Sequence, residues 1–253
     1  MAAGGKVSSE PAPSGAGVAG LQKHIDSIVD LHRAAQLNNV PALQRCTGAN
    51  NPKQQVPSLD TVDRTGMTPL IVAARHNSIN AAAWLIDHGA NVNAAGFAGK
   101  TALMHAVQCG HLGVAELLIS RNADVNCVDG QGLTPLMAAS AAGSMQLIDL
   151  LATHGAQINV QSKTNSTALM MAVLSTQTAI VELIVTKLGA ALTAQNSHGQ
   201  TALHLAVRIE CAALVDKLLR LGCDPNAVDG DGKRPVDLAS NTIRQTVQWE
   251  AAQ

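Results

Sequence analysis

The sequence predicts an all-α solenoid, in which helix-turn-helix units stack side by side and a finger projects from each unit. The tripeptide Thr-Pro-Leu or Thr-Ala-Leu returns along the 253-residue chain at intervals of 33 or 34 residues. Copies begin at Thr68, Thr101, Thr134, Thr167 and Thr201, and a degenerate copy begins at Arg234. This period is typical of helical repeats, because one such unit cannot bury its apolar face alone. Aromatic content is only 1%, which suits a core made of rows of alanine and aliphatic side chains.

Composition divides the chain into three segments. Residues 1–20 are rich in Gly, Ala, Ser and Pro without periodicity, which predicts a disordered N-terminal tail. Residues 21–62 predict an N-terminal capping repeat followed by a polar loop. Residues 63–253 predict the regular repeat array, which ends in a C-terminal capping repeat.

Within each unit, the tripeptide marks the start of the first helix. Its threonine is an N-cap residue whose hydroxyl accepts a backbone N–H, and a proline after it fits the first helical position. Two residues before the threonine stands a glycine or Asn165, the residue types that accept a positive φ in a tight turn. An alanine follows five residues after each start, where neighbouring helices must approach closely. These alanines are Ala73, Ala106, Ala139, Ala172, Ala206 and Ala239.

These residues resemble the ankyrin repeat, whose pattern is D-x-x-G-x-T-P-L-x-x-A-A followed by a helix ending in L-L-x-x-G-A-x-V-N-A. One copy here opens with Asp63 to Leu70 and closes with Gly89 to Ala94. The resemblance covers residues 21–253 and implies about seven stacked repeats with projecting β-hairpin fingers. It also implies a protein that binds other proteins.

One unit, which begins at Thr167, departs from the pattern. It has Asn165 in place of glycine, Thr176 where glycine often separates the two helices, and Thr193 in place of asparagine. It is also one residue longer than its neighbours. We expect a local change in stacking there and the lowest local stability in the array.

Charge and cysteine content argue against several function classes. The net charge is −1 and 14% of residues are charged, so no nucleic-acid-binding surface is expected. The five cysteines include no C-x-x-C pair, which disfavours a zinc site or a disulfide framework and favours a reducing compartment. No apolar run reaches roughly 18 residues, and the N-terminus lacks the pattern of a signal peptide. We expect a cytoplasmic protein without membrane insertion, with the nucleus as a further location.

Patterns that carry metal or catalytic chemistry elsewhere have structural explanations here. His105 and His111, like His198 and His204, are six residues apart, which does not place two ligands on one helix face. The Asp-Gly turns, such as that at Asp129, lack both the Lys-Ser/Thr of a phosphate loop and the Glu of a calcium loop. We expect no enzyme activity, no metal and no cofactor.

Function is expected on the surface. Ankyrin arrays usually hold partners with their fingertips and the exposed edge of the first helix, which implies a set of binding residues. They are Arg64, Met67, Arg75, Phe97, Lys100, Gln108, Leu133, Lys163, His198, Arg208 and Ile209. Phe97, the only phenylalanine, fits either a binding hot spot or packing against its own hairpin. Met104, Met137, Met170 and Met171 fit either a binding stripe or core filling.

A second hypothesis for the surface is covalent modification. Asn126 and Asn226 follow the patterns L-x5-D-V and L-x5-D-P. This resembles the sites at which an intracellular asparaginyl hydroxylase modifies ankyrin proteins. The alternative is that both side chains bridge neighbouring loops by hydrogen bonds.

The sequence therefore favours a monomeric, non-enzymatic protein–protein interaction module that acts as an adaptor, scaffold, inhibitor or assembly chaperone. The partner is expected on the concave face formed by the fingertips and the inner helices. Two alternatives are a structural linker of membrane or cytoskeletal proteins and a substrate-recognition subunit of an enzyme complex.

Overall fold

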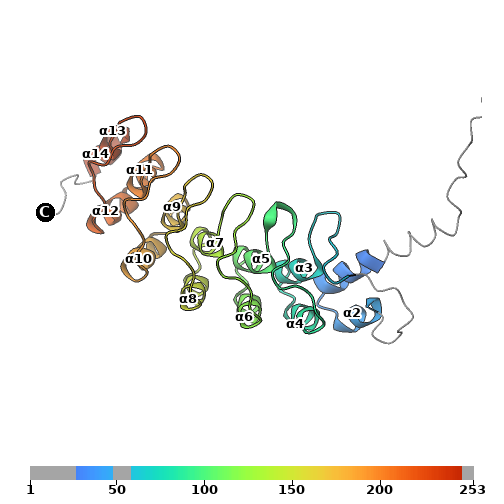
Figure 1. Cartoon of the computed structure of the whole chain (residues 1–253). Helices are drawn as coiled ribbons and strands as arrows, with labels where there is room; N and C mark the ends of the chain where they lie inside the picture. The colour runs from blue at the N-terminus through green and yellow to red at the C-terminus, as the bar shows by residue number, and fades with distance from the viewer. Residues whose placement is uncertain (1–26, 48–57, 247–253) are drawn as a thin grey trace, which may run out of the picture.

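The computed structural model describes residues 27–47 and 58–246; the N-terminal tail expected at 1–20 lies outside them. The helices form two parallel rows, and the stack bends toward the side from which the fingers project (Figure 1). This arrangement confirms the predicted all-α solenoid. Within the described ranges, no helix is long and apolar enough to cross a membrane.

The two rows contain the first and second helices of successive units. The inner row, next to the fingers, consists of α3 (Pro69–Arg75), α5 (Ala102–Gln108), α7 (Pro135–Ala142), α9 (Ala168–Leu174), α11 (Ala202–Arg208) and the short α13 (Pro235–Leu238). The outer row consists of α2 (Val40–Cys46), α4 (Ile79–Asp87), α6 (Leu112–Ser120), α8 (Met145–Thr153), α10 (Thr178–Thr186) and α12 (Ala212–Arg220). A helix over residues 27–36 precedes α2, and α14 (Asn241–Thr246) ends the array.

The threonine of each tripeptide caps its inner helix as predicted. The hydroxyl of Thr68 accepts the N–H of Ile71 at 3.3 Å, and the equivalent bond recurs at the next three units. Thr201 instead shares a capping box with His204, whose imidazole also contacts the carbonyl of Lys233 at 3.0 Å. Each such cap is worth about 1 kcal/mol.

Alanine and leucine rows form one continuous core. The alanine at the fifth position after each start is fully buried in every unit from Ala73 to Ala206. A methyl group at this point lets neighbouring inner helices approach closely, because interiors pack without voids. The leucines one turn earlier, such as Leu70 and Leu136, fill the space between the rows.

The fingers follow the path of a hairpin but contain little β-ladder. In the first finger the N–H of Asp63 donates to the carbonyl of Met67, while the Asp63 carboxylate accepts the N–H groups of Thr65 and Met67. Because this carboxylate takes the donor that a second ladder bond would use, no strand forms. In the described residues the single β-bridge joins Ala95 to Thr101.

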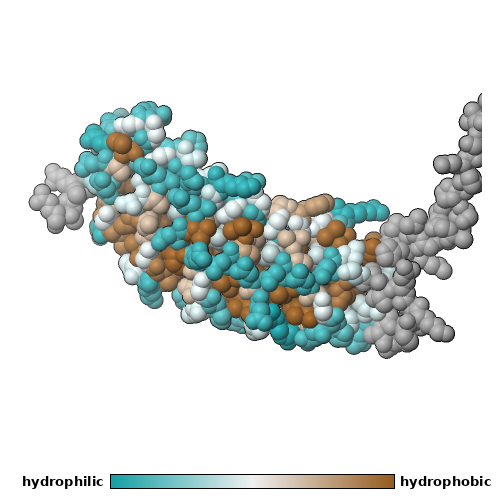
Figure 2. Space-filling model, in the orientation of Figure 1, coloured by the Kyte–Doolittle hydropathy of each residue, from teal (hydrophilic) through white to brown (hydrophobic). Residues whose placement is uncertain are grey.

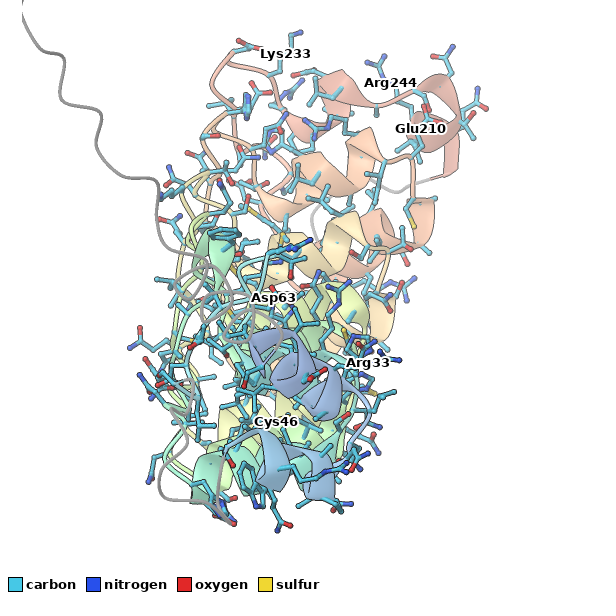
Figure 3. All side chains as sticks on the ribbon, turned by 90° about the vertical axis from the view of Figure 1, so that its right-hand side faces the viewer. Arg33, Cys46, Asp63, Glu210, Lys233 and Arg244 are labelled. Atoms are coloured by element: carbon cyan, nitrogen blue, oxygen red, sulfur yellow. The ribbon has the colours of Figure 1, made fainter. Side chains whose placement is uncertain are left out.

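Two ladders of hydrogen bonds tie successive units together. Backbone bonds join neighbouring fingers, for example from the N–H of Lys163 to the carbonyl of Gln131 at 2.9 Å. Asparagine side chains join the loops that follow the outer helices. The oxygen of Asn93 accepts the N–H of Asp124, and Asn126 and Asn159 do the same one and two units further on. Figure 3 shows these fingers stacked along one side of the molecule.

The divergent unit absorbs its extra residue at the end of α10. There the N–H of Ala190 reaches back six residues to Ile184, whereas Ala156 and its equivalents reach back five. At this step α7 and α9 make the most extensive contact of all inner pairs, while α8 and α10 contact each other least among the described outer neighbours. This is the local change in stacking that the sequence predicts; low local stability stays a prediction.

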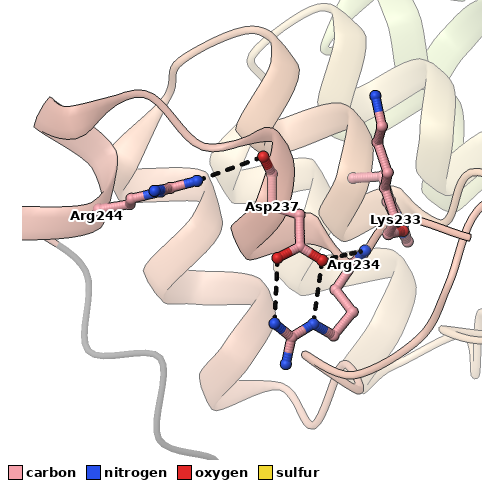
Figure 4. Close-up of polar contacts among 5 residues, drawn as sticks. Lys233, Arg234, Asp237 and Arg244 are labelled. Atoms are coloured by element: carbon pink, nitrogen blue, oxygen red, sulfur yellow. Dashed lines mark hydrogen bonds and ion pairs between the residues drawn. The ribbon is translucent and has the colours of Figure 1, made fainter.

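The last unit is a shortened cap. The guanidinium of Arg234 binds both oxygens of Asp237, which also accepts the Arg234 backbone N–H, and Arg244 donates to the Asp237 carbonyl (Figure 4). These contacts lower the pKa of Asp237 to about 2, mainly through its hydrogen bond with the Arg234 side chain. They close the open end of the stack with polar groups.

Candidate functional site

Two positions in each unit, eight residues apart, face the concave side. One lies at the base of the finger and the other at or just before the end of the inner helix. The pairs are Met67 and Arg75, Lys100 and Gln108, Leu133 and Ala141, Ser166 and Leu174, and Gln200 and Arg208.

Three of these pairs are joined by hydrogen bonds. Lys100 Nζ donates to Gln108 Oε1 at 3.1 Å. Arg208 Nη1 donates to Gln200 Oε1 at 2.9 Å, and an Arg75 nitrogen contacts the Met67 sulfur at 3.8 Å. The two central pairs, those of Leu133 and Ser166, have no such bond. The row therefore has polar ends and a mainly apolar centre.

A groove of about 300 Å³ lies at this centre, over α7. Its floor consists of Ala138, Ala141 and Ala142. The equivalent positions of α5 carry His105, Gln108 and Cys109, which are larger. The groove exists because α7 has a methyl group at all three of these positions.

Side chains from three units complete the walls. Lys100, Met104 and Gln108 stand on the α5 side, Met171 on the α9 side, and Leu133 at the base of the finger. Met104 is largely buried and Met171 is half-buried, so each adds an apolar edge. Met137 and Met170 are fully buried and belong to the core. Core filling therefore fits Met137 and Met170, while a binding role for Met104 and Met171 stays a prediction.

The groove contains one carboxylate, that of Asp129, and its finger already binds it. Asp129 accepts the N–H of Gln131 at 2.8 Å and that of Leu133 at 3.0 Å. The residue is only 8% exposed. Its charge is therefore directed toward its own backbone rather than toward the opening.

Cations on the concave side lack acidic partners. None of the four ion pairs in the described residues lies on the inner row of the regular units. Two join neighbouring segments of the outer row, one lies within α12, and one lies in the C-terminal cap. They are Arg121–Asp87, Lys217–Glu182, Arg220–Asp216 and Arg234–Asp237. Arg75, Lys100 and Arg208 have only neutral hydrogen-bond partners within the described chain. These three cations therefore form no ion pair within the described chain, and the one carboxylate of the groove lining, Asp129, is bonded to its own finger backbone.

His105 reports this positive field. Burial, followed by the nearby charges of Lys100 and Arg75, lowers the pKa of its imidazole to about 4. The ring is neutral at physiological pH, so the positive charge of this surface comes from the lysine and arginine side chains.

The structure groups the predicted binding residues unequally. Lys100, Gln108 and Leu133 line the groove. Met67, Arg75 and Arg208 continue the same row on either side. Arg64, Lys163 and His198 are exposed on fingertips, away from the groove lining. Ile209 is half-buried after α11 and, like Met67 and Leu133, packs against the edge of the core.

Phe97 lies on an unusual finger. Gly96 occupies the position that Asp63 and Asp129 hold elsewhere, so this finger has no carboxylate to organise its turn. The ring of Phe97 lies over Gly66 of the preceding finger, so close that a side chain at that position would clash with it. It is nevertheless 71% exposed, so packing against the neighbour leaves most of the ring available.

A wider hollow of about 750 Å³ lies at the N-terminal end, between Val29, Val62 and Val72. Its lining begins at Ile28, next to the limit of the described residues. Apolar surface also extends along the body of the array in the view of Figure 2, interrupted by hydrophilic residues. Apolar surface alone therefore does not select a site. The central groove combines it with a defined lining and with Lys100, which has no acidic partner.

Sequence reasoning missed the alanines of α7. The signal that could have found them was a comparison of exposed positions between units, in which α7 alone has alanine at all three floor positions.

Asn126 and Asn226 lie in the loops after α6 and α12. The side chain of Asn126 bridges to Gly155 and Gln157, as the structural alternative requires, whereas that of Asn226 has no partner in the described chain.

Fold and groove together define a class of protein, a solenoid of stacked helix pairs with an open concave side. A family model described as ankyrin repeats, in three copies, matches residues 31–129, 119–196 and 136–229. The chain belongs to the ankyrin repeat family. Ankyrin repeats generally mediate protein–protein interaction.

Solved structures agree with this assignment. The ankyrin repeat domain of human ASB11 has a TM-score of 0.73 at 22% identity, covering 85% of this chain and 95% of that one. The ankyrin repeat domain of Bcl-3, a member of the IkappaB protein family, has a TM-score of 0.73 at 25% identity, covering 86% and 96%.

Curated relatives match over short stretches. Regulatory protein SWI6 of Saccharomyces cerevisiae is 42% identical over 53 residues, which is 21% of this chain and 7% of that protein. Its counterpart in Kluyveromyces lactis is 41% identical over 51 residues, or 20% and 7%. The match spans a small part of these relatives' length.

Proposed function

We propose that this chain is a non-enzymatic protein–protein interaction module whose partner lies along the concave side, with the groove over α7 at its centre. The observation that supports this most strongly is the groove itself, an apolar hollow of about 300 Å³ between pre-positioned polar side chains. Binding energy in interfaces concentrates where a large side chain fills such a pocket. Adaptor, scaffold, inhibitor and assembly chaperone are all roles that this mode of binding serves.

Site-specific photo-crosslinking in cells tests the position of the partner. A photoreactive amino acid replaces Gln108, at the groove edge, or Gln146, which is also exposed but lies on the outer helix α8. The expected result is a protein adduct at position 108 that is absent or much weaker at 146. Equal adducts at both positions, or adducts only at 146, would exclude the concave side as the binding surface.

Single substitutions on the same face provide a second test once an adduct is identified. Phe97→Ala and Arg208→Ala are expected to weaken binding of the captured partner without lowering the melting temperature, because both side chains are on the surface. A lower melting temperature with unchanged binding would mean that these residues are structural. The captured protein's identity separates a regulator from a linker of membrane or cytoskeletal proteins.

A further inference from the structure

We propose that the segment that enters the groove is an acidic polypeptide, with one large aliphatic or aromatic side chain between flanking carboxylates. This inference rests on the proposed function, because it names the chemistry of the partner at the same surface. It follows from the groove's shape and from the charges on either side of it.

The shape selects an apolar anchor. The floor is three methyl groups from Ala138, Ala141 and Ala142, and the walls include Met104 and Met171. A flexible thioether adapts to the outline of an inserted side chain, so the walls can fit aliphatic or aromatic groups. A polar side chain would lose its water on such a floor without gaining a hydrogen bond.

The charges select carboxylates beside that anchor. Lys100 borders the groove. Arg75 ends α3, one unit before Lys100, and Arg208 ends α11, the inner helix that follows α9. Each is already held by a neutral group, at 3.1 Å for Lys100 and 2.9 Å for Arg208, so a partner need not order it. A carboxylate would form a charge-assisted bond with each, stronger than the neutral bond it supplements.

The arrangement fits a polypeptide better than a nucleic acid. The row carries cations in three of its five units, on either side of a centre without any, whereas a phosphate backbone requires a continuous row of lysine and arginine. Leu133 at the finger base and Leu174, which is 42% exposed, interrupt the row over the central units. Those positions match apolar side chains of a peptide rather than phosphates.

Selection from a displayed library of random 12-residue peptides on the immobilised full chain tests the proposal. Selected peptides are expected to be enriched in Asp and Glu around one large apolar residue and depleted in Lys and Arg. Lys100→Glu is expected to weaken their binding at least about tenfold, which corresponds to one charge-assisted contact. Ala141→Met, which fills the groove, is expected to weaken binding to a similar extent.

Matched substitutions on the outer row control for general effects. Ala152→Met changes a half-buried alanine of α8, and Lys187→Glu reverses an exposed lysine at the end of α10. Both are expected to leave affinity within about twofold. An unchanged melting temperature for each variant shows that the array is intact.

His105 gives a readout that does not depend on a substitution. Its pKa of about 4 is expected to rise when an acidic peptide binds, because carboxylates offset the charges of Lys100 and Arg75. An apolar contact alone would bury the ring further and lower the pKa. NMR titration of the imidazole with and without a selected peptide distinguishes these directions.

The outcomes separate the two hypotheses. Peptides that bind the concave side without acidic enrichment, and that tolerate Lys100→Glu, would overturn the proposed partner chemistry while the binding surface stands. Peptides insensitive to both Lys100→Glu and Ala141→Met would overturn the proposed surface as well. Recovery of no peptide, or binding of an oligouridine probe that Lys100→Glu abolishes, would also refute the acidic-polypeptide proposal.

Discussion

Replacement of Asn126 by alanine is expected to loosen the contact between two units of the array. Its Oδ1 accepts the N–H of Gln157 at 2.8 Å, and its Nδ2 donates to the carbonyl of Gly155 at 3.1 Å. Both partners belong to the loop of the following unit, so the side chain joins units rather than stabilising its own. The substitution removes both bonds and leaves the rest of the loop in place.

The magnitude follows from these two bonds. A net hydrogen bond contributes about 0.5–1.5 kcal/mol, and the lower half of that range applies here because the site is partly open to water. Asn126→Ala is therefore expected to lower the free energy of unfolding by about 1–2 kcal/mol. Asn226→Ala is the matched control, because its side chain has no partner in the described chain, and a change below about 0.5 kcal/mol is expected.

Two measurements check this expectation. Urea unfolding followed by circular dichroism gives the change in free energy, and hydrogen exchange gives the local effect. The amide of Gln157 is expected to exchange about tenfold faster in Asn126→Ala and at an unchanged rate in Asn226→Ala. Equal destabilisation by both substitutions, or an unchanged Gln157 rate, would refute the bridging role.

Three further expectations concern the same ladder and the surface. Thr193→Asn is designed to restore the asparagine bridge that the divergent unit lacks, because the new side chain can accept the N–H of Asp224. The free energy of unfolding in urea titrations is expected to rise by about 1 kcal/mol. No gain would mean that the least stable contact of the array lies between other units. Iodoacetamide at neutral pH is expected to label exposed Cys109 but not buried Cys223. Burial raises the pKa of the Cys223 thiol to about 12, so little reactive thiolate forms. Equal labelling of both cysteines in the folded protein would contradict this. If the asparagines are hydroxylated in cells, mass spectrometry is expected to find one added oxygen more often at Asn226 than at Asn126, because the Asn226 side chain has no bridge within the described residues.

Local features of the fold could be read from the sequence because each depends on residues close together in the chain. A threonine hydroxyl caps a helix three residues later, as Thr68 does, and a glycine such as Gly66 turns a finger with a φ of 70°. The fixed repeat length then determines that equivalent faces meet, which predicts the stack. The extra residue near Gly189 is visible in the sequence for the same reason.

The candidate site depended on side chains from units that meet only in the folded stack. Met104, Ala141 and Met171 come from three inner helices, and no spacing rule states that small side chains on α7 leave a hollow between larger neighbours. The position of Ile209 at a binding edge stays a prediction, and the structure shows the residue half-buried against the core.

The amino-acid sequence alone determined the class of fold, its unit length and the turn chemistry, because these arise from local hydrogen bonds repeated at a constant period. Tertiary structure alone decided which cations remain without an acid. Arg121 and Lys217 find carboxylates on neighbouring outer helices, while Lys100 and Arg208 meet only amide oxygens. Ion pairing depends on distance in space, and that distance leaves Lys100 and Arg208 on the concave side without an acidic partner.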